Sequence, residues 1–548
     1  MRKVSLATIV TLLPAFSFGQ TLKASPPLLL DASLEDLRSG LDQGVFTSVD
    51  LVQTYIARIK ETHHALRAVV EINPDALAIA AQLDRQRAEA RPDSPPLGPL
   101  HGIPVLVKDN MATADGMNTT AGSFALVGAR PANDSTVVSK LRKAGAIILG
   151  KTNMSQWASS RSGSIPEGWS AVGGQTFGAY FPGQNPSGSS SGSAVGTSIG
   201  LAWAALGSET TTSIIQPAHI NNCVGIKPTL GLTSRHLVVP FSTHQDSVGP
   251  IARTVKDAAH LLAAIAGPDV NDNYTTAIPF HEIPDYVAAC KPDALRGKRI
   301  GVVRNAHELF YDEATETSLE AFNNSLNVLR DAGAQVIDNI MLQGIQPLIF
   351  GNYQFNILAA DLYSNLPEQY VRHLQENPQN ITSLQDLVNF TKTSPKENYP
   401  TYDTQFWDIA LNMAIDVDSS EFWSQYSAAI KYSGPLGITG ALQQYSLDAL
   451  VMPSLYASLT ASIIGTPVIS VPLGKSPNNS PVIPFPDQTS NITAPNQPFG
   501  IGFAGLAFSE ESLIGLAYAF EQKTQIRTKV KPIIRPTTEL ADILTRPE

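Results

Sequence analysis

The stretch "GSSSGSAVGTSIGLAWAALGSETTTSIIQP", residues 188–217, decides how this chain is interpreted. It holds eleven serine and threonine hydroxyls, a glycine-rich start and no histidine. A serine hydroxyl is a weak nucleophile unless a neighbouring base takes its proton. No histidine outside the stretch has the spacing of a Ser-His-Asp triad, and the pattern G-x-S-x-G is absent around Ser213. The histidines considered as bases are His101, His219, His236 and His244.

A lysine can serve as the base if it is uncharged. Its usual pKa is about 10.4, and burial in apolar surroundings lowers a lysine pKa by up to about 3–5 units. Lys108 ends the apolar run 103–107 in "GIPVLVKDN", so its stem is expected to enter the interior. The alternative is a solvent-facing lysine at a strand end. This strand alone leaves both interpretations open.

Composition sets the broad class of the protein. The chain has 548 residues, of which 43% are hydrophobic and 16% charged, so it can bury a large core. The net charge of −10 and the absence of a basic cluster argue against a nucleic-acid partner. The histidines lack H-E-x-x-H spacing, and no Rossmann or P-loop fingerprint is present, so neither a metal site nor a cofactor is predicted.

The first residues, "MRKVSLATIVTLLPAFSFGQ", follow the pattern of an export signal. Two basic residues precede a short apolar run, and the small residues Ser17 and Gly19 stand before Gln20. We expect a signal peptide at 1–19 and a secreted mature chain. A retained signal anchor is the alternative, but the run is shorter than the about 18 apolar residues that a span needs. No later segment reaches that length, so no stable membrane span is expected.

The glycosylation sequons and the cysteines are two further tests of the expectation that the chain is secreted. N-x-S/T sequons are more frequent than expected in a cytosolic enzyme, which favours a glycoprotein. They begin at Asn118, Asn133, Asn153, Asn273, Asn323, Asn380, Asn389, Asn478 and Asn491. Two cysteines permit one disulfide at most, and Cys223 lies in an apolar stretch that predicts a buried thiol.

The pattern along the chain predicts an α/β fold. Helical spacing runs from 33 to 90, and "TSVD" at 47–50 is expected to cap a helix. Buried strands and helices then alternate from "GIPVLVKDN" through "DSTVVSKLRKAGAIILGKTN". Residues 270–450 are expected to be mostly helical. "LDALVMPS" and "TPVISVPLG" are further predicted strands, and "EESLIGLAYAFEQKTQIR" is a closing amphipathic helix.

Seven motifs in order give the chain a family resemblance. They are "GPLHGIPVLVKDN", "TTAGSFAL", "LRKAGAIILGKTNMSQWA", "GSSSGSAVG", "LGSETTTSIIQPA", "VGIKPTLGLTSR" and "DSVGPIART". Together they resemble the amidase signature family, over about residues 30–530 and most densely over 98–254. The chain is most similar to the secreted fungal and bacterial branch, which shares "GWS…GGQT" and the S-S-S form of the serine loop.

The resemblance implies a fold and a reaction. The expected fold is one amidase signature domain at 20–548, with a large, twisted, mostly parallel mixed sheet between helices on both faces. The segment at about 270–450 would form the variable side of the substrate site. The expected reaction is hydrolysis of non-peptide amides, and of esters, by a Ser-cisSer-Lys triad through an acyl-enzyme. The implied substrate is a small-molecule amide or ester, and the oligomeric state is left open.

The site residues follow from the same resemblance, position by position. Lys108 falls on the family's lysine, Ser189 on its bridging serine and Ser213 on its nucleophile. The backbone N–H groups that stabilise the oxyanion fall on the turn around the nucleophile. That turn consists of Thr210, Thr211, Thr212 and Ser213.

The chain departs from the family pattern at this turn. Where the family often has D-T-G-G-S-I-R-Q-P, this chain has E-T-T-T-S-I-I-Q-P. Thr211 and Thr212 replace glycines, Ile215 replaces an arginine, and Glu209 keeps the acidic partner of that arginine. We expect negative φ at both threonines, with their side chains narrowing the acyl side of the pocket. Ser191 also stands where the family commonly has glycine.

Two other functions remain open at this point. One is a biosynthetic family member that transfers or trims an acyl group by the same chemistry. The other is a degenerate relative that binds a ligand without turnover, which the intact triad disfavours and the altered turn favours. An amidotransferase subunit working in translation is disfavoured by the export signal.

Overall fold

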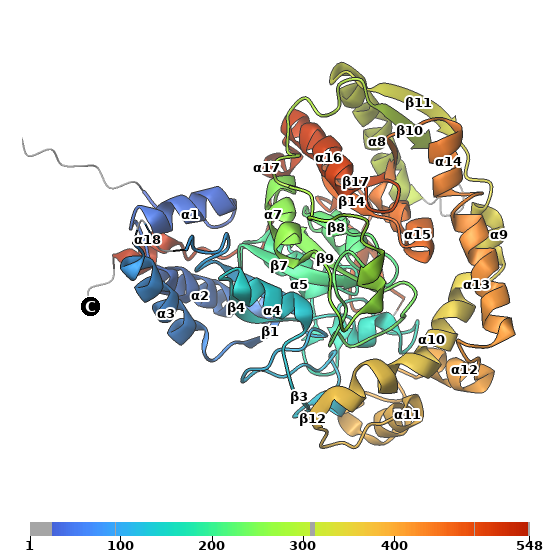
Figure 1. Cartoon of the computed structure of the whole chain (residues 1–548), viewed down its shortest axis with the longest axis horizontal. Helices are drawn as coiled ribbons and strands as arrows, with labels where there is room; N and C mark the ends of the chain where they lie inside the picture. The colour runs from blue at the N-terminus through green and yellow to red at the C-terminus, as the bar shows by residue number, and fades with distance from the viewer. Residues whose placement is uncertain (1–24, 92, 94, 307–312, 487, 546–548) are drawn as a thin grey trace, which may run out of the picture.

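The computed structural model describes residues 25–91, 93, 95–306, 313–486 and 488–545. The predicted signal peptide at 1–19 lies outside these residues. An eleven-stranded sheet forms the centre of the molecule (Figure 1). In spatial order its strands are β1 (Val69–Ile72), β4 (Ile147–Thr152), β2 (Pro104–Lys108), β7 (Ala204–Glu209), β9 (Ser247–Ala252), β8 (Val224–Lys227), β14 (Val468–Lys475), β17 (Pro498–Ala504), β13 (Ala449–Pro453), β10 (Arg299–Val303) and β11 (Gln335–Ile340).

Parallel pairing is confined to two blocks at the two sides of the sheet. One block is β4–β2–β7 and the other is β13–β10–β11. The strands between them pair antiparallel, and so does β1 with β4. The predicted α/β class, a large mixed sheet flanked by helices, is confirmed. Its middle is more mixed than the mostly parallel sheet that the resemblance implies.

Two sets of helices pack on the sheet. One set is α5 (Ser191–Ser198), α6 (Ile215–Ile220) and α15 (Ser454–Ile464), which contact β7, β14 and β17. The other set is α7 (Val255–Ile265), α8 (Glu313–Asp331) and α16 (Glu510–Thr524), which contact β9 and β14. The strands between them are apolar and fully buried, as at Val105, Leu106 and Val107 in β2.

The N-terminal helices lie beside β1, at one edge of the sheet (Figure 1). They are α1 (Leu34–Asp42), α2 (Ser48–Leu66) and α3 (Ala76–Glu89), joined there by α18 (Leu540–Leu544). The predicted cap is confirmed, because the Thr47 side chain accepts from Asp50 N and the Asp50 carboxylate accepts from Thr47 N. The segment 33–90 also contains β1, a strand that the helical spacing did not predict.

Residues 270–450 supply most of the remaining helices. These are α9 (Ile345–Phe350), α10 (Tyr353–Gln369), α11 (Leu384–Thr393), α12 (Gln405–Met413), α13 (Ser420–Ser433) and α14 (Ile438–Gln444). The mostly helical prediction holds for them, and Figure 1 shows them curving around one side of the molecule. The same segment adds β10 and β11 to the sheet, which the sequence did not predict.

Short elements connect these layers. They are α4 (Thr136–Lys143), α17 (Ile526–Lys529), and the two-stranded pairs β3 (Arg130–Pro131) with β12 (Leu374–Glu376), β5 (Trp169–Ser170) with β6 (Gly174–Gln175), and β15 (Ile483–Pro484) with β16 (Asn491–Thr493).

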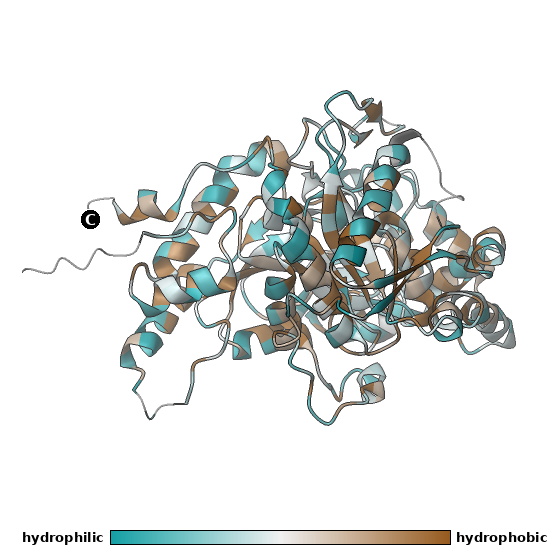
Figure 2. Ribbon diagram, turned by 90° about the horizontal axis from the view of Figure 1, so that it is seen from above, coloured by the Kyte–Doolittle hydropathy of each residue, from teal (hydrophilic) through white to brown (hydrophobic). Residues whose placement is uncertain are grey.

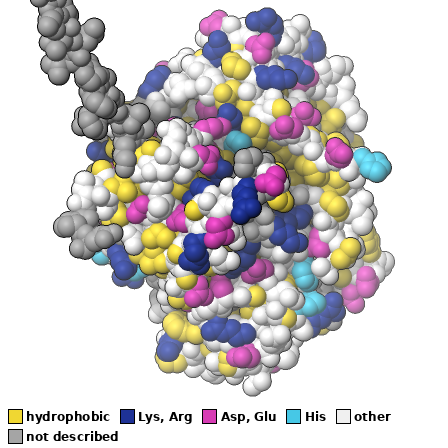
Figure 3. Space-filling model, turned by 60° about the vertical axis from the view of Figure 1, so that its left-hand side comes forward, with side chains coloured by type: hydrophobic (Ala, Val, Ile, Leu, Met, Phe, Trp, Pro, Cys, Tyr) yellow, Lys and Arg dark blue, Asp and Glu magenta, His cyan; other side chains and the backbone are white. Residues whose placement is uncertain are grey.

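Polarity is sorted between interior and surface. Brown, hydrophobic residues concentrate on the inner strands, whereas many outer helical faces are teal (Figure 2). Acidic and basic side chains are interspersed on the face shown in Figure 3. Across the part of the chain that the structure covers, no helix is long and apolar enough to cross a membrane. Cys223 is a free, buried thiol, as predicted, and Cys290 is free and half-buried.

Candidate active site

The carboxyl ends of β2 and β7 lie on the same side of the sheet. The two strands are parallel neighbours, so their carboxyl ends meet, and in α/β sheets ligands bind outside such ends. Lys108 is the last residue of β2, and Glu209 is the last residue of β7. The serine loop (residues 188–190), which precedes α5, and the threonine turn (residues 210–213), which precedes α6, both lie beside these carboxyl ends.

Lys108 enters the interior, as the first of the two interpretations of its strand predicts. It is fully buried, and its Nζ lies 2.7 Å from Ser189 Oγ. Nζ also donates to Ser208 Oγ at 2.9 Å and to the Ser208 carbonyl at 3.1 Å. Burial lowers the pKa of Lys108 to about 7, against the opposing charges of Asp246 and Glu209. The amine is therefore partly uncharged at neutral pH.

Ser189 is held by its backbone as well as by Lys108. The peptide bond between Gly188 and Ser189 is cis, and the Ser189 carbonyl accepts from Ser155 N at 3.1 Å. A side chain at position 188 would collide with Ser155, because a Cβ there would lie 2.2 Å from Ser155 Oγ. Glycine at 188 therefore permits the close approach that aims Ser189 at the lysine.

Ser213 lies next to the serine loop, though its hydroxyl is turned aside. Its carbonyl accepts from Ser190 N at 3.1 Å, which joins the two segments. Ser213 Oγ lies 3.5 Å from the Thr211 carbonyl. Within the described residues, no hydrogen bond links the Ser189 and Ser213 hydroxyls. Catalytic hydrogen bonds are often long or misaligned in free enzymes, so this geometry does not exclude a relay.

Most of the other hydroxyls in the stretch 188–217 donate hydrogen bonds to backbone carbonyls. Ser190 Oγ donates to the Ser208 carbonyl at 3.1 Å, and Ser193 Oγ donates to the Leu206 carbonyl at 2.9 Å. Ser191, which stands at the family's glycine position, donates to the Ser187 carbonyl at 2.6 Å. The Ser190 and Ser193 bonds fasten the serine loop and α5 to β7, whereas the Ser191 bond only spans the loop.

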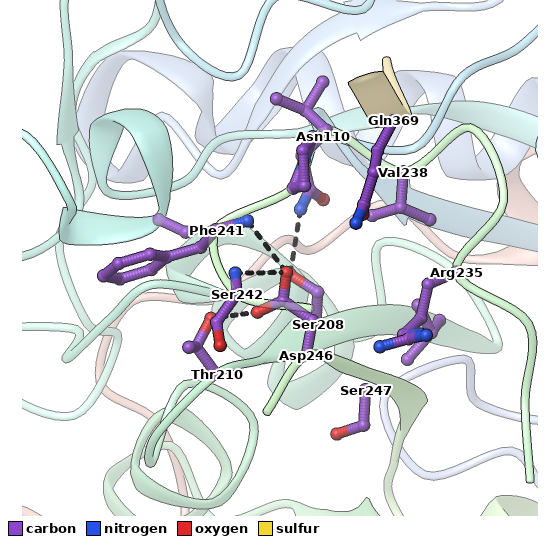
Figure 4. A pocket seen from close by; sticks show the side chains of 14 residues that line it. Asn110, Ser208, Thr210, Arg235, Val238, Phe241, Ser242, Asp246, Ser247 and Gln369 are labelled. Atoms are coloured by element: carbon purple, nitrogen blue, oxygen red, sulfur yellow. Dashed lines mark hydrogen bonds between the residues drawn. The ribbon is translucent and has the colours of Figure 1, made fainter. Parts of the chain in front are cut away.

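The threonine turn is held from two sides. Thr210 Oγ1 donates to Asp246 at 2.6 Å, and the Asp246 carboxylate also accepts from the backbone of Phe241 and Ser242 (Figure 4). Thr211 Oγ1 accepts from Gln354 Nε2 on α10 at 2.6 Å. The Thr211 side chain is thus tied to α10.

The expectation of negative φ at both threonines is wrong for Thr212. Its φ is +66°, in the left-handed region, whereas Thr211 lies outside that region. Side chains branched at Cβ are rare at positive φ. The turn has thus kept a backbone shape that suits glycine at position 212, although the residue there is threonine.

Among the described residues, the backbone N–H groups of Thr211, Thr212 and Ser213 donate no hydrogen bond to the protein. They precede α6, so they are not part of its internal ladder. Free donors at the turn before a nucleophile are what an oxyanion site requires.

Glu209 has backbone partners in place of the arginine that is missing at position 215. Its Oε2 accepts from Ile214 N at 2.6 Å and from Ile215 N at 2.9 Å. The carboxylate therefore holds the backbone that directly follows Ser213, and Ile215 itself is buried in the apolar core.

The four candidate histidines are engaged elsewhere. His101 bonds the Leu83 carbonyl, and His219 Nδ1 accepts from Gly500 N at 2.7 Å. His244 Nδ1 lies 2.9 Å from Asp361. The His236 ring packs edge-on against His373. In the part of the chain described, none of them bonds a hydroxyl of the threonine turn or of Ser189.

Two spaces adjoin the site. A small pocket is lined by Asn110, Ser208, Thr210 and Asp246, and in Figure 4 the Asn110 amide points at Ser208. A larger cavity of about 320 Å³ borders the serine loop and α6. Within the described ranges, no group of three or more His, Cys, Asp or Glu side chains is placed to hold a metal ion.

Three residues that contact the site were not predicted from the sequence. Ser208 and Asp246 lie inside the quoted motifs "LGSETTTSIIQPA" and "DSVGPIART", so a role for them could have been inferred from those motifs. Gln354 could not be found this way, because it lies 143 residues from Thr211 and in no motif.

Comparison with known proteins agrees with this architecture. The family model described as amidase matches residues 50–514. A putative amidase of Arthroderma benhamiae is 47% identical over 539 residues, covering 94% of this chain and 90% of the relative. A probable amidase of Arabidopsis thaliana is 38% identical, with 94% of each chain covered. The native peptide amidase from Stenotrophomonas maltophilia has a TM-score of 0.81 at 36% identity, covering 92% of this chain and 98% of its own. The chain therefore belongs to the amidase signature family of carbon–nitrogen hydrolases.

Proposed function

We propose that the protein is a secreted hydrolase of non-peptide amides, and also of esters, that uses Ser213, Ser189 and Lys108 as a Ser-cisSer-Lys triad. One observation carries this proposal. The fully buried Lys108 amine lies 2.7 Å from Ser189 Oγ, and burial lowers its pKa to about 7. A neutral amine at this place is a base that needs no histidine.

Acylation follows from this arrangement. Ser213 Oγ attacks the amide carbonyl carbon and passes its proton to Ser189 Oγ, whose own proton goes to Lys108 Nζ. The carbon–nitrogen bond then breaks, and the leaving nitrogen takes a proton from Ser189, which is resupplied by Lys108. An ester on Ser213 remains, and water hydrolyses it by the same relay. Rotation of the Ser213 side chain away from the Thr211 carbonyl has to precede the attack.

The threonine turn supplies the oxyanion donors in this scheme. The backbone N–H groups of Thr211, Thr212 and Ser213 are free for a carbonyl oxygen, and we include Thr210 N–H as a further donor. One such donor is typically worth about 2.7–4 kcal/mol in the transition state. Because the donors are backbone groups, threonine can replace glycine without removing them.

Export completes the proposal. The signal-like residues 1–19 and the nine sequons support a secreted glycoprotein, close to the secreted fungal and bacterial branch of the family. No cofactor is required by the relay.

The test is turnover of amides and esters of graded acyl and amine size by the purified protein. Lys108→Ala and Ser189→Ala should each lose orders of magnitude in kcat, and the double variant should lose little more. Residues that act as one unit are strongly non-additive. Losses that multiply in the double variant would show that the two residues act separately.

A second candidate is a binding protein without turnover. The observation that favours it is the positive φ of Thr212 beside a Ser213 hydroxyl that is turned aside. A wild-type protein that binds amides but turns over none of the graded series would support it.

A further inference from the structure

The cavity of about 320 Å³ contains a carboxylate that the proposed relay does not use. Glu167, Asn185 and Ser187 line its side toward the serine loop, and Gln216 and His219 of α6 line a second side. Its apolar wall comes from α15, the β15–β16 pair and β17. That wall consists of Leu455, Tyr456, Phe485, Ile492 and Phe499.

This cavity touches both segments that carry the reacting serines. A Cβ placed on Gly188, the residue before Ser189, would lie 3.5 Å from the Glu167 Cβ. Gln216 is three residues beyond Ser213, and its N–H donates to the Thr212 carbonyl at 2.8 Å. One end of an amide bound at Ser213 therefore has this cavity as its neighbouring space.

Glu167 has no cationic partner among the described residues. Its side chain is half-buried, and a hydrogen bond from Ser187 partly offsets the effect of burial on its pKa. Burial raises the pKa of Glu167 to about 7, and no lysine or arginine charge opposes that rise. A carboxylate whose purpose was structural would be expected to have such a partner, because an unpaired charge is costly in apolar surroundings.

The other titratable groups at the cavity do not neutralise it. Burial lowers the pKa of His219 to about 4, so its ring is uncharged near neutral pH. Its Nδ1 accepts from Gly500 N, which places the ring proton on Nε2. Among the described residues that line the cavity, Glu167 is the one acidic side chain, and it stands beside a largely apolar wall.

We propose that this cavity binds an ammonium group of the substrate against Glu167, so that the enzyme prefers amides with an apolar body ending in a protonated amine. This inference rests on the proposed function, since it names the substrate class of the same site. The apolar wall accepts the hydrocarbon portion, and the carboxylate accepts the N–H bonds of the ammonium. Charge-assisted hydrogen bonds of this kind are about twice as strong as neutral ones.

The test uses matched pairs of p-nitroanilides. One member carries an ω-amino acyl chain, and the other carries the alkyl chain in which a methyl replaces the ammonium. A series of chain lengths locates the carboxylate without assuming its distance from Ser213. We expect wild-type kcat/KM to favour the ammonium member by about tenfold at the best length, and Glu167→Gln to remove that preference.

Two further variants serve as controls. Glu511→Gln removes one negative charge from the exposed surface of α16 and should keep the wild-type preference. Glu167→Asp keeps the charge on a shorter side chain and should restore the preference at a longer acyl chain. This rescue separates recognition from a folding defect in Glu167→Gln.

The pH dependence gives an independent readout. The ratio of the two kcat/KM values should rise with pH through about 7, as Glu167 loses its proton. Ionisation of Lys108 affects both members equally and cancels in the ratio. In Glu167→Gln the ratio should be flat.

The outcomes separate the two proposals. If neutral anilides are hydrolysed but no chain length shows a preference, or if Glu167→Gln retains it, the ammonium site is wrong and the hydrolase stands. If no amide is hydrolysed, the proposed function fails.

The ammonium site at Glu167 is then tested by calorimetry with hexylammonium, which should bind Ser213→Ala about tenfold more tightly than Ser213→Ala/Glu167→Gln. Equal or absent binding would overturn it.

Discussion

At the scale of single residues, the proposed relay requires an uncharged Lys108. Its neutral form takes the Ser189 proton, so activity requires Lys108 to be deprotonated. Since burial lowers its pKa to about 7, kcat/KM for a neutral amide should rise as pH increases through about 7 and then level off. A pH–rate profile of the free enzyme measures this. A kcat/KM that does not rise between about pH 6 and 8 would contradict a lysine base.

Thr212 gives a second prediction at the residue scale. A positive φ at a non-glycine residue costs on the order of 1–3 kcal/mol, and glycine removes that strain. Glycine also costs about 0.5–1 kcal/mol of chain entropy, so Thr212→Gly should raise the thermal midpoint slightly.

Thr211→Gly is the matched control for that variant. Thr211 has no positive φ to relieve, and its side chain bonds Gln354, so its replacement should lower the thermal midpoint. Equal shifts in the same direction for the two variants would show that the backbone of Thr212 stores no strain.

At the scale of elements, α10 supports the turn that contains Ser213. Gln354 Nε2 donates to Thr211 Oγ1 at 2.6 Å and to Gln245 Oε1 at 3.0 Å. Gln354→Ala should therefore lower kcat by about tenfold with little change in KM, because the oxyanion donors lose their support. Gln385→Ala is the control, since the side chain of that exposed glutamine of α11 bonds only its helix neighbour Asn389 within the described residues.

A double-mutant cycle completes this test. Gln354→Ala and Thr211→Gly remove the same hydrogen bond, so their effects on kcat should not add. Additive losses would mean that Gln354 acts on the rate through some other contact.

The elements also show what the sequence could predict and what it could not. β2 and β4 were predicted because each is a short apolar run. β7 was not among the predicted strands, since its sequence "AALGSE" ends in polar residues. β11 was not, because its burial is mixed and its sequence "QVIDNI" has no clear alternation. The positive φ of Thr212 and the contact from Gln354 depend on tertiary packing, which local pattern does not report.

At the scale of the whole molecule, the proposed export predicts which sequons carry glycans. Asn153 is buried, and its Nδ2 donates to Gly174 O at 2.9 Å and to Thr176 Oγ1 at 2.8 Å. A glycan on that nitrogen would break both bonds, so Asn153 should be unmodified. Exposed sequons such as Asn273 and Asn380 should be occupied in protein secreted by a eukaryotic host. Glycopeptide mapping, with N-terminal sequencing for a start near Gln20, checks this. Recovery of the intact chain from Met1 in the cytosol would contradict export.

The central claim is that Ser213 forms the acyl-enzyme, and covalent labelling measures this most directly. Wild-type protein treated with a fluorophosphonate, or with a slowly hydrolysed ester, should gain one adduct by intact mass. Digestion should place that adduct on the peptide containing Ser213, and Ser213→Ala should gain none. An adduct that persists at the same level in Ser213→Ala, or that maps to another residue, would contradict the account.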